Sequence, residues 1–386
     1  MKKNSKQKIV YPERLVVSVA EPSRRVFVGM SGGVDSSVAA ALLKKEGYDV
    51  VGVHLKCFNV DGCAAEDAED ARRAAEHLNI PFYAFDYEQE YKDLVVKYMV
   101  DGYKKGITPN PDVMCNKEIK FGLFYKKALE MGADFVATGH YALLRELKVP
   151  SSKLKVRMIA IAKDKNKDQS YFLWTLKPEQ LKHCLFPVGD YTKPQVRKLA
   201  EKFGLHNATK KDSQGICFLG QVSLPDFLAK YIKPKKGAIL DIHGNEIGEH
   251  HGAHFYTIGQ RHGLGVGGSD KPLYVASKDI KKNIVVVAEG EDNPALYRKE
   301  VVLTDVNLFF EPLSLRGAKR RGNLTAIPVS ARVRYRQPLQ PAVLTLNFKL
   351  KTGELKFHRP MKFVAPGQSA VFYDKKGTML GGGIIK

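Results

Sequence analysis

Features that would place this chain in a membrane or in an oxidising compartment are missing from its 386 residues. No apolar run approaches the roughly 20 residues that a membrane-spanning helix needs. The first 30 residues start basic but lack the apolar core and the small-residue cleavage site of a signal peptide. Five cysteines are a small, odd number for so long a chain, which favours a reducing compartment over a disulfide framework. We therefore expect a cytoplasmic protein without membrane contact.

Metal-ligand spacings and dinucleotide fingerprints are absent as well. No CxxC pair and no paired Cys/His spacing supports zinc or an iron–sulfur cluster, so we expect no protein-ligated metal. Histidines 250, 251 and 254 have no partner carboxylate at helical spacing, which favours solvated loop histidines. The glycine run at 263–268 follows no clear βαβ start, which favours a tight turn over a Rossmann phosphate loop.

Positive charge is in large excess. Lys and Arg number 62 against 41 Asp and Glu, a formal net charge of +21. Such an excess favours a polyanionic partner, either nucleic acid or an anionic membrane, and no strongly amphipathic basic helix supports the membrane. Residues 291–386 alone hold 17 Lys and Arg against 7 Asp and Glu. We therefore expect the C-terminal part of the chain to bind nucleic acid.

Strand and helix patterns alternate up to about residue 140, which is typical of parallel βαβ units with helices on both faces of the sheet. Helical signals then persist through 177–203. The strands are expected at 25–30, 49–55, 81–86 and 134–138, and the helices at 38–45, 64–78, 88–103 and 117–131.

The sequence texture changes after residue 224. Glycine-containing turns recur among short Val/Ile/Tyr/Phe runs such as 283–288, 331–335 and 342–348, an all-β pattern that favours a barrel. Length alone suggests two or three domains. We expect a catalytic α/β domain at 1–220 with a basic, disordered extension at 1–24, a small β-rich central domain at 221–290, and a basic β-barrel at 291–386.

The most informative segment is a glycine- and serine-rich loop between an expected strand and an expected helix. Its glycines let backbone amides turn inward, its hydroxyls add donors, and the helix N-terminus adds a positive dipole end, which together suit a pyrophosphate group. No Gly-Lys-Ser/Thr follows, so it is not a Walker A loop. Asp35 is suited to bind Mg²⁺ or to orient a nucleotide. The alternative for the whole loop is a plain Gly/Ser turn with a helix cap. The loop comprises Gly29, Met30, Ser31, Gly32, Gly33, Val34, Asp35, Ser36 and Ser37.

Two of the five cysteines lie in polar, turn-rich surroundings. Cys115 follows turn-forming residues, and we expect it at the N-terminus of a helix starting at Lys117, where the dipole and nearby lysines favour the thiolate. Asp112 is close enough in sequence to exchange a proton with a reacting group. Cys217 is flanked by glycines and follows two lysines, which predicts an accessible loop suited to carry sulfur. The alternative for each cysteine is a small buried apolar residue, the interpretation that we favour for Cys184.

The SGGVDS loop resembles the PP-loop of the ATP pyrophosphatase superfamily, and its combination with the two cysteines resembles the tRNA-specific 2-thiouridylase (MnmA-type) family. The resemblance runs from the loop nearly to the C-terminus, so it covers almost the whole chain. Matching stretches are ATGHY at 137–141, NKDQSYFL at 166–173, FYTIGQR at 255–261, RYR at 334–336 and PGQSAV at 366–371.

The resemblance implies a PP-loop (adenine nucleotide α-hydrolase-like) fold and ATP-dependent replacement of an oxygen by sulfur. The C2 carbonyl of a uridine is a poor electrophile, so its oxygen would first attack the α-phosphate of ATP and expel pyrophosphate. Sulfur from a persulfide would then add at C2 and AMP would depart, giving 2-thiouridine. The target is the wobble uridine (position 34), everted from the anticodon stack. Mg²⁺ would accompany the nucleotide.

Site residues are carried over from the same resemblance. ATP would be bound by 29–36, by Leu55 and by Gly139, and the target base by Asn110, Pro111 and Asp112. Cys115 would be the nucleophile, Cys217 the persulfide carrier and Asp112 the proton shuttle. The expected tRNA contacts are His140, Lys167, Asp168, Gln169, Arg334, Tyr335 and Gln368.

Partners follow in the same way. The expected acceptors are the tRNAs for Lys, Glu and Gln, and the expected sulfur donor is a cysteine desulfurase or a sulfur-relay protein. Another PP-loop thiolase, making 4-thiouridine or 2-thiocytidine, and a non-catalytic tRNA-binding protein are alternatives. No added N-terminal RNA-binding module and no CxxC cluster ligands support the other thiolases. Residues Lys319–Arg321 are expected in an exposed loop that either touches tRNA or is only solvated, while Cys57 and Cys63 receive no role.

Overall fold

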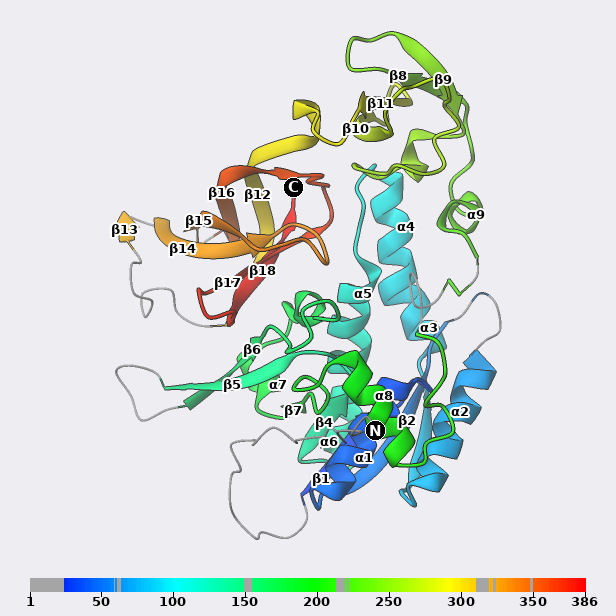
Figure 1. Ribbon diagram of the computed structural model, residues 1–386, viewed down its shortest axis with the longest axis vertical. Helices are drawn as coiled ribbons and strands as arrows, with labels where there is room; N and C mark the ends of the chain where they lie inside the picture. Colours follow the sequence, from blue (N-terminus) through cyan, green and yellow to red (C-terminus); the bar gives the residue numbers. More distant parts are fainter. Residues whose placement is uncertain are drawn as a thin grey trace, which may run out of the picture.

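The computed structural model describes residues 24–58, 60, 64–148, 155–212, 219–220, 222–309, 319–321, 324–347 and 350–386. Three larger sheets follow one another along the chain, and Figure 1 shows them as a parallel sheet with its helices, a small sheet at the far end and a barrel between them. Residues 1–23 of the expected N-terminal extension, Cys63 and Cys217 lie outside the described residues.

The N-terminal sheet is parallel, with strand order β3-β2-β1-β4-β7. In the centre, β1 pairs in parallel with both β2 and β4. The expected α/β class with a parallel sheet is confirmed. The strands are β1 (Arg25–Gly29), β2 (Asp49–Lys56), β3 (Phe82–Asp86), β4 (Phe135–Thr138) and β7 (Cys184–Leu185).

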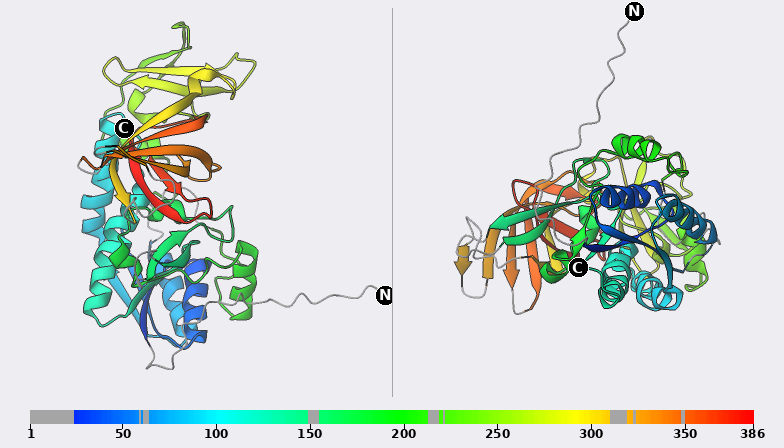
Figure 2. Two further views of the ribbon diagram at one scale, coloured as in Figure 1. Left: turned by 90° about the vertical axis from the view of Figure 1, so that its left-hand side faces the viewer. Right: turned by 90° about the horizontal axis from the view of Figure 1, so that it is seen from below.

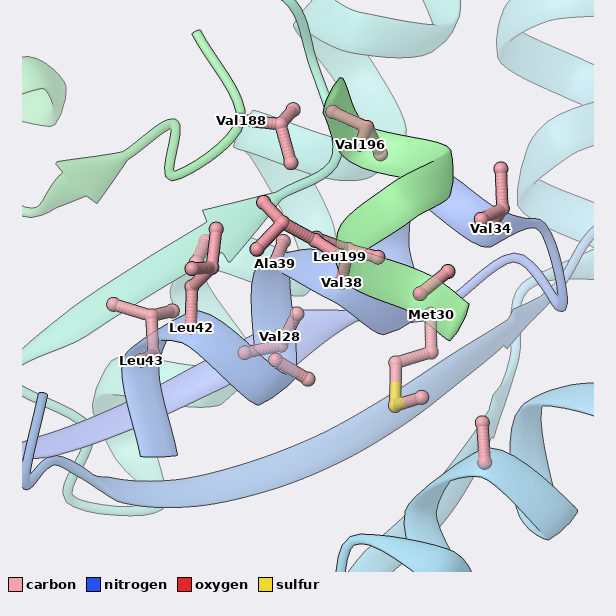
Figure 3. Packing of buried hydrophobic residues seen from close by; sticks show 14 of the residues in the cluster. Val28, Met30, Val34, Val38, Ala39, Leu42, Leu43, Val188, Val196 and Leu199 are labelled. Atoms are coloured by element: carbon pink, nitrogen blue, oxygen red, sulfur yellow. The ribbon is translucent and has the colours of Figure 1, made fainter. Parts of the chain in front are cut away.

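One face of this sheet is covered by α1 (Val34–Lys45), α2 (Ala64–His77) and α8 (Lys193–Lys202). Figure 3 shows side chains from β1, α1 and α8 packing together, among them Val28, Val38 and Leu199. All three are fully buried, so the loop between β1 and α1 has a rigid base.

Two longer helical stretches follow: the first packs against the four-stranded sheet described below, and the second covers the other face of the parallel sheet with Phe124 and Ala128. The first joins α3 (Glu88–Tyr91), a π-helical segment (Lys92–Val96) and α4 (Lys97–Lys104), and the second joins α5 (Pro111–Met114), a π-helical segment (Cys115–Phe124) and α6 (Tyr125–Glu130). The second corrects an expectation, because the helix begins at Pro111 rather than at Lys117. Asn110 caps it by accepting a hydrogen bond from the Val113 backbone N–H (3.2 Å), and proline fits its first turn.

A four-stranded sheet with order β10-β11-β8-β9 follows the short helix α9 (Leu224–Ala229). Its strands are β8 (Gly237–Leu240), β9 (Glu246–His250), β10 (Leu273–Asp279) and β11 (Ile284–Glu289). His250 is 2% exposed here, so the expectation of a solvated histidine was wrong at this position. Gly263, Gly265 and Gly268 have positive φ and no helix follows them, as a turn requires.

The C-terminal sheet closes into a barrel, as expected. Its order is β13-β14-β15-β16-β12-β18-β17, and β14 also pairs with β17, which leaves β13 outside a closed six-stranded ring. Closure removes the open edges that a sheet otherwise exposes. The strands are β12 (Tyr297–Leu308), β13 (Lys319–Arg321), β14 (Leu324–Arg332), β15 (Gln340–Asn347), β16 (Thr352–Lys362), β17 (Ser369–Tyr373) and β18 (Met379–Ile385). Residues Lys319–Arg321, expected in a loop, form the strand β13.

The sequence pattern missed several short elements before β7. These are an antiparallel hairpin, β5 (Leu143–Lys148) with β6 (Lys155–Ala160), and a 3₁₀ turn (Ser170–Leu173). The helix α7 (Pro178–Leu181) lies where the helical signal was expected to begin. Cys184 lies on β7 instead of in a helix, but its burial is confirmed: it is 0% exposed, and burial raises the pKa of its thiol. Within the described residues, no helix is both long and apolar enough to span a membrane.

The barrel is joined to the α/β region by a buried polar and aromatic interface. The Trp174 indole N–H donates to Ser369 Oγ (2.9 Å), and the Tyr171 hydroxyl donates to the Ser369 carbonyl (2.9 Å). Beside them, the Arg332 guanidinium donates to the Asp168 carboxylate, and both side chains are almost fully buried. Figure 2 shows the barrel stacked against the α/β region, as these contacts require.

Removing the Arg332 charge is expected to destabilise the whole chain. Arg332→Met leaves the Asp168 carboxylate buried without its cation, which costs about 3–5 kcal/mol of unfolding free energy. Denaturant unfolding measures the loss. The matched control is Lys356→Met, which breaks an exposed pair with Glu300 and should leave the midpoint nearly unchanged. Equal effects of the two variants would contradict the prediction.

Candidate nucleotide and sulfur-transfer site

The glycine loop connects the end of β1 to the first turn of α1. Ser36 Oγ accepts a hydrogen bond from the Ser31 backbone N–H (3.2 Å) and donates to the Gly33 carbonyl (3.1 Å). From outside the loop, Asn207 Nδ2 donates to the Gly32 carbonyl (2.9 Å) and to Ser37 Oγ (3.0 Å). The conformation of the loop is therefore fixed by Ser36 from within the loop and by Asn207, which follows α8.

Two glycines of the site have no room for a side chain. Gly32 has φ +76°, and a Cβ there would lie 2.3 Å from the Asp67 carbonyl oxygen on α2. At Gly139, which follows β4, a Cβ would lie 2.6 Å from the Ser36 backbone nitrogen. Gly139 therefore lies directly against the first turn of α1, where a helix N-terminus and its backbone N–H groups favour an anion.

Asp35 is held by two side chains that the sequence reasoning missed. Lys193 Nζ lies 2.7 and 2.8 Å from the two carboxylate oxygens of Asp35, and the Tyr141 hydroxyl donates to Asp35 Oδ1 (2.7 Å). Lys193 is the first residue of α8, and its side chain is 10% exposed. The sequence signal for this role was weak, because Thr192-Lys193-Pro194 also reads as an ordinary helix start.

A second carboxylate, Asp212, extends this network. Its carboxylate oxygens pair with the side-chain nitrogens of Lys193 (2.8 Å), Lys167 (2.5 Å) and Arg197 (2.9 Å). Burial works to raise the pKa of Asp212, but the hydrogen bonds from Lys167 and Lys193 outweigh it and hold the pKa at about 2. Asp212 is therefore ionised at neutral pH, and Lys193 bridges two carboxylates.

The helix that carries Cys115 meets the sheet beside this loop. Cys115 is 5% exposed and belongs to the same apolar cluster as Leu55 at the end of β2, while Asp112 is partly exposed. A Cβ on Gly29 would touch the Phe124 ring at 3.5 Å, which places the end of β1 against the end of the π-helical segment. Gly29, Leu55 and Gly139 thus stand at or just after the carboxyl ends of three adjacent strands, the edge at which ligands bind in such sheets.

The segment before Asn110 is held by the C-terminal barrel. Gln368 Nε2 donates to the Thr108 carbonyl (2.9 Å) and to the Pro109 carbonyl (3.3 Å), and the Thr108 N–H donates to the Pro366 carbonyl (2.7 Å). Asn110 is 8% exposed. The predicted base-binding residues therefore lie where the barrel reaches the α/β region.

The residues predicted to contact tRNA are mostly engaged inside the protein. His140 is 8% exposed between aromatic rings, and burial lowers the pKa of its imidazole well below its usual value. Asp168 is paired with Arg332, and Gln169 Oε1 accepts from the Tyr141 backbone N–H (2.9 Å). Gln169 thereby holds the backbone of Tyr141, whose hydroxyl binds Asp35. The predicted contacts of His140, Asp168 and Gln169 with tRNA stay predictions.

Arg334 and Tyr335 lie in a turn after β14 rather than in the strand expected at 331–335. Arg334 Nη2 donates to the Ile258 carbonyl (2.9 Å), which links the barrel to the loop before β10, and burial lowers the pKa of the guanidinium. Tyr335 packs against Phe172 with ring centroids 4.4 Å apart. Lys167 is about one third exposed, and its ammonium group pairs with Asp212.

The structure places the loop 29–36, Leu55 and Gly139 at one edge of the sheet, and the helical stretch that begins at Pro111 reaches the end of β1 at Phe124, nine residues after Cys115. Cys217, the expected persulfide carrier, lies outside the described residues. The side chains that sequence reasoning missed are Lys193, Tyr141, Asp212 and Asn207, all of which act through the loop or through Asp35.

Family models match three consecutive parts of the chain. Residues 24–221 match the model described as tRNA methyl transferase HUP domain, and residues 225–289 match the tRNA methyl transferase PRC-barrel domain. Residues 312–385 match the aminomethyltransferase beta-barrel domain. The first model alone covers more than half of the chain.

Curated relatives are similar over nearly the whole length. The tRNA-specific 2-thiouridylase MnmA of Chlamydia abortus is 44% identical over 371 residues, which are 94% of this chain and 98% of that protein. MnmA 1 of Geobacillus kaustophilus is 44% identical over 369 residues, 94% and 95% of the two chains. Among solved structures, a 4-thiouridine synthetase–RNA complex with bound ATP is 20% identical over 54% of this chain and 49% of that chain. The TM-score of this match is 0.36.

Proposed function

Since this chain belongs to the tRNA-specific 2-thiouridylase family, we propose that it replaces the C2 oxygen of the wobble uridine of tRNA by sulfur, using ATP. The chain is an enzyme of tRNA modification with a nucleotide-binding α/β domain. The observation that supports the proposal is the contact of the end of β1, where the glycine loop starts, with the helical stretch that carries Cys115, made by Gly29 and Phe124. Activation of an oxygen by ATP and attack by sulfur need both groups at the same base.

ATP would lie on the loop 29–36, with its phosphates on the backbone N–H groups of the first turn of α1. The Asp35 carboxylate offers the oxygen ligands that Mg²⁺ prefers. It pairs with Lys193 in the structure, and a bound ion would add positive charge beside the phosphates. Leu55 and Gly139 would border the nucleotide from neighbouring strands. Adenylation of the base then makes AMP the leaving group in place of oxide.

Sulfur transfer would use both cysteines. The terminal sulfur of a Cys217 persulfide attacks C2, the C2–O bond breaks and AMP departs, which leaves the base joined to Cys217 through a disulfide. The Cys115 thiolate then attacks the Cys217 sulfur, so that a Cys115–Cys217 disulfide forms and 2-thiouridine is released. In the other route, Cys115 attacks the persulfide first and releases sulfide as the nucleophile. Asp112 would carry the proton.

Partners belong to the same proposal. The tRNA substrate follows from the family, and the wobble uridines of Lys, Glu and Gln tRNAs are the proposed targets. The excess of 17 Lys and Arg over 7 Asp and Glu in residues 291–386 supports a phosphate grip on the barrel. A cysteine desulfurase or a relay protein would load the persulfide.

Nucleoside analysis tests the activity. Unmodified tRNA is incubated with the protein, Mg²⁺-ATP, a cysteine desulfurase and cysteine, and its nucleosides are separated by chromatography. ATP-dependent 2-thiouridine is the expected product. A 4-thiouridine or 2-thiocytidine product would move the protein to another kind of thiolase. If no thionucleoside forms, the protein only binds tRNA. If a methylated nucleoside forms when a methyl donor is added, the protein is a methyltransferase, as the descriptions of the matching domain models suggest.

Lys193→Met is expected to weaken ATP binding by about 10- to 100-fold. Without the lysine, the carboxylates of Asp35 and Asp212 lose a shared cation, and their negative charge then repels the phosphates of ATP. Affinity for ATP is measured by titration calorimetry, and tRNA affinity is measured separately. Lys198→Met, on the exposed face of the same helix, is the matched control. Unchanged ATP affinity in the Lys193 variant would show that the network only stabilises the fold.

A further inference from the structure

The backbone at 107–109, which leads from α4 into the Cys115 helix, is held from two sides. From the barrel, the turn at 366–368 makes three hydrogen bonds to Thr108 and Pro109. From the loop before β10, Thr257 Oγ1 accepts from Thr108 Oγ1 (3.3 Å). Thr108 itself is 7% exposed. The entry to the catalytic helix is therefore set by parts of the chain about 150 and 260 residues away in sequence.

The barrel turn is itself rigid. The Gly367 N–H donates to the Ile385 carbonyl (2.8 Å), and the Ile385 N–H donates to the Gln368 carbonyl (2.8 Å), so the turn is tied to the last strand of the barrel. Gly367 has φ +89°, and a Cβ there would lie 2.9 Å from the Thr108 carbonyl carbon and oxygen. The two backbones are in direct contact with no side chain between them.

Gln368 uses both of its amide protons in this contact. Nε2 has two donors, and they go to two consecutive carbonyls immediately before Asn110, the cap of the helix. Asp112 follows Thr108 by four residues and Cys115 follows it by seven. A shift of the clamped backbone is therefore passed through the capped helix start to both groups.

We propose that the 366–368 turn of the barrel is a positioning element for catalysis, which holds the 108–109 backbone so that Asp112 and Cys115 face the target base. This inference rests on the proposed function and assigns Gln368 a role other than the tRNA contact expected from the family. The barrel then does more than grip tRNA, because its docking completes the geometry of the catalytic helix. Losses near 100-fold are known for displacements of about 1 Å at a reacting centre.

Gly367→Ala tests the contact without altering any side chain that could touch tRNA. At saturating tRNA, the single-turnover rate of 2-thiouridine formation is expected to fall by about 10-fold or more, while the dissociation constant for tRNA stays within about twofold. The matched control is Gly244→Ala: this glycine has φ +91° with nothing within 4 Å of an added Cβ, so it carries the same backbone strain without the contact. Rates equal to the control, or a loss of tRNA affinity in proportion to the rate, would overturn the proposal.

A second pair of variants covers the case in which Gly367→Ala fails to fold. Gln368→Met keeps the side-chain length and removes both donors, and it should reduce the rate as above. Gln368→Lys restores donors toward the two carbonyls and should recover most of the rate. No recovery, together with weaker tRNA binding in both variants, would return Gln368 to the expected tRNA contact.

Hydrogen exchange supplies a readout that does not depend on activity. Amides of the 107–116 peptide are expected to exchange about 10-fold faster in Gly367→Ala than in Gly244→Ala, in the full-length protein without substrates. Unchanged exchange would overturn the positioning role. If the wild type made no 2-thiouridine, the proposed function would fail, and the exchange experiment would still decide this inference.

Discussion

Cys115→Ser is expected to reduce 2-thiouridine formation from a persulfide donor by at least about 10³-fold, because a serine hydroxyl does not ionise as a nucleophile at neutral pH. Cys115 is 5% exposed and belongs to the apolar cluster against which Leu55, near the end of β2, packs. Binding of tRNA and pyrophosphate release from ATP should continue, since neither step needs the thiol. Quantitative nucleoside analysis gives the rate.

Cys184→Ser is the matched control for a buried thiol. Cys184 is 0% exposed on β7, in a different cluster from Cys115, and burial raises the pKa of its thiol so that it stays protonated. The substitution costs stability through a buried hydroxyl but should leave the rate per folded molecule unchanged. If the Cys115→Ser variant thiolates tRNA normally, Cys115 has no role in the mechanism.

Radioactive sulfur separates the two cysteine roles. With a cysteine desulfurase and labelled cysteine, Cys115→Ser is expected to retain label on the protein as a persulfide, whereas Cys217→Ser should retain none. Both variants should bind tRNA normally. Label retained on Cys217→Ser would show that the persulfide is carried elsewhere in the chain.

Gly32→Ala is expected to abolish ATP binding, with at least about a 100-fold loss of affinity. An added Cβ would lie 2.3 Å from the Asp67 carbonyl oxygen, which is backbone and cannot rotate away, and φ +76° is strained for alanine. The loop must therefore move, and with it the Gly32 carbonyl that accepts from Asn207. Calorimetric titration with Mg²⁺-ATP measures the loss.

Gly47→Ala is the control at the other end of the same helix. Gly47 has φ +87° and nothing within 4 Å of an added Cβ, so its substitution costs about 1 kcal/mol of strain without a clash. ATP affinity should match the wild type. If Gly32→Ala also bound ATP normally, the phosphates would not lie on this loop.

The parallel sheet could be predicted because its strands are short apolar runs with turn residues between them. The expected strand at 49–55 and helix at 64–78 agree with β2 and α2 to within one residue. The start of the Cys115 helix was misplaced because Asn110-Pro111 reads as a loop, although proline also fits the first turn of a helix behind an asparagine cap. The hairpin β5–β6 lacked an alternating pattern strong enough to detect.

The candidate site could be predicted only where the chemistry lies in one contiguous motif. The loop 29–36 and Cys115 belong to such motifs. Lys193 acts on Asp35 from 158 residues away, and its role depends on how α8 packs on α1. Asp168 illustrates the opposite error, since a charged residue expected at a surface is fully engaged by Arg332 in the interior. Local patterns carry no information about such long-range pairs.

The interface around Trp174 provides an optical probe. The chain holds one tryptophan, its side chain is 3% exposed, and its indole N–H donates to Ser369 of the barrel while Gly382 packs against its ring. All intrinsic indole fluorescence therefore originates at the junction of barrel and α/β region. If the barrel separates, water reaches the indole and its emission shifts to longer wavelength. Stopped-flow fluorescence during refolding, or on addition of tRNA, would time the docking of the barrel without any attached dye.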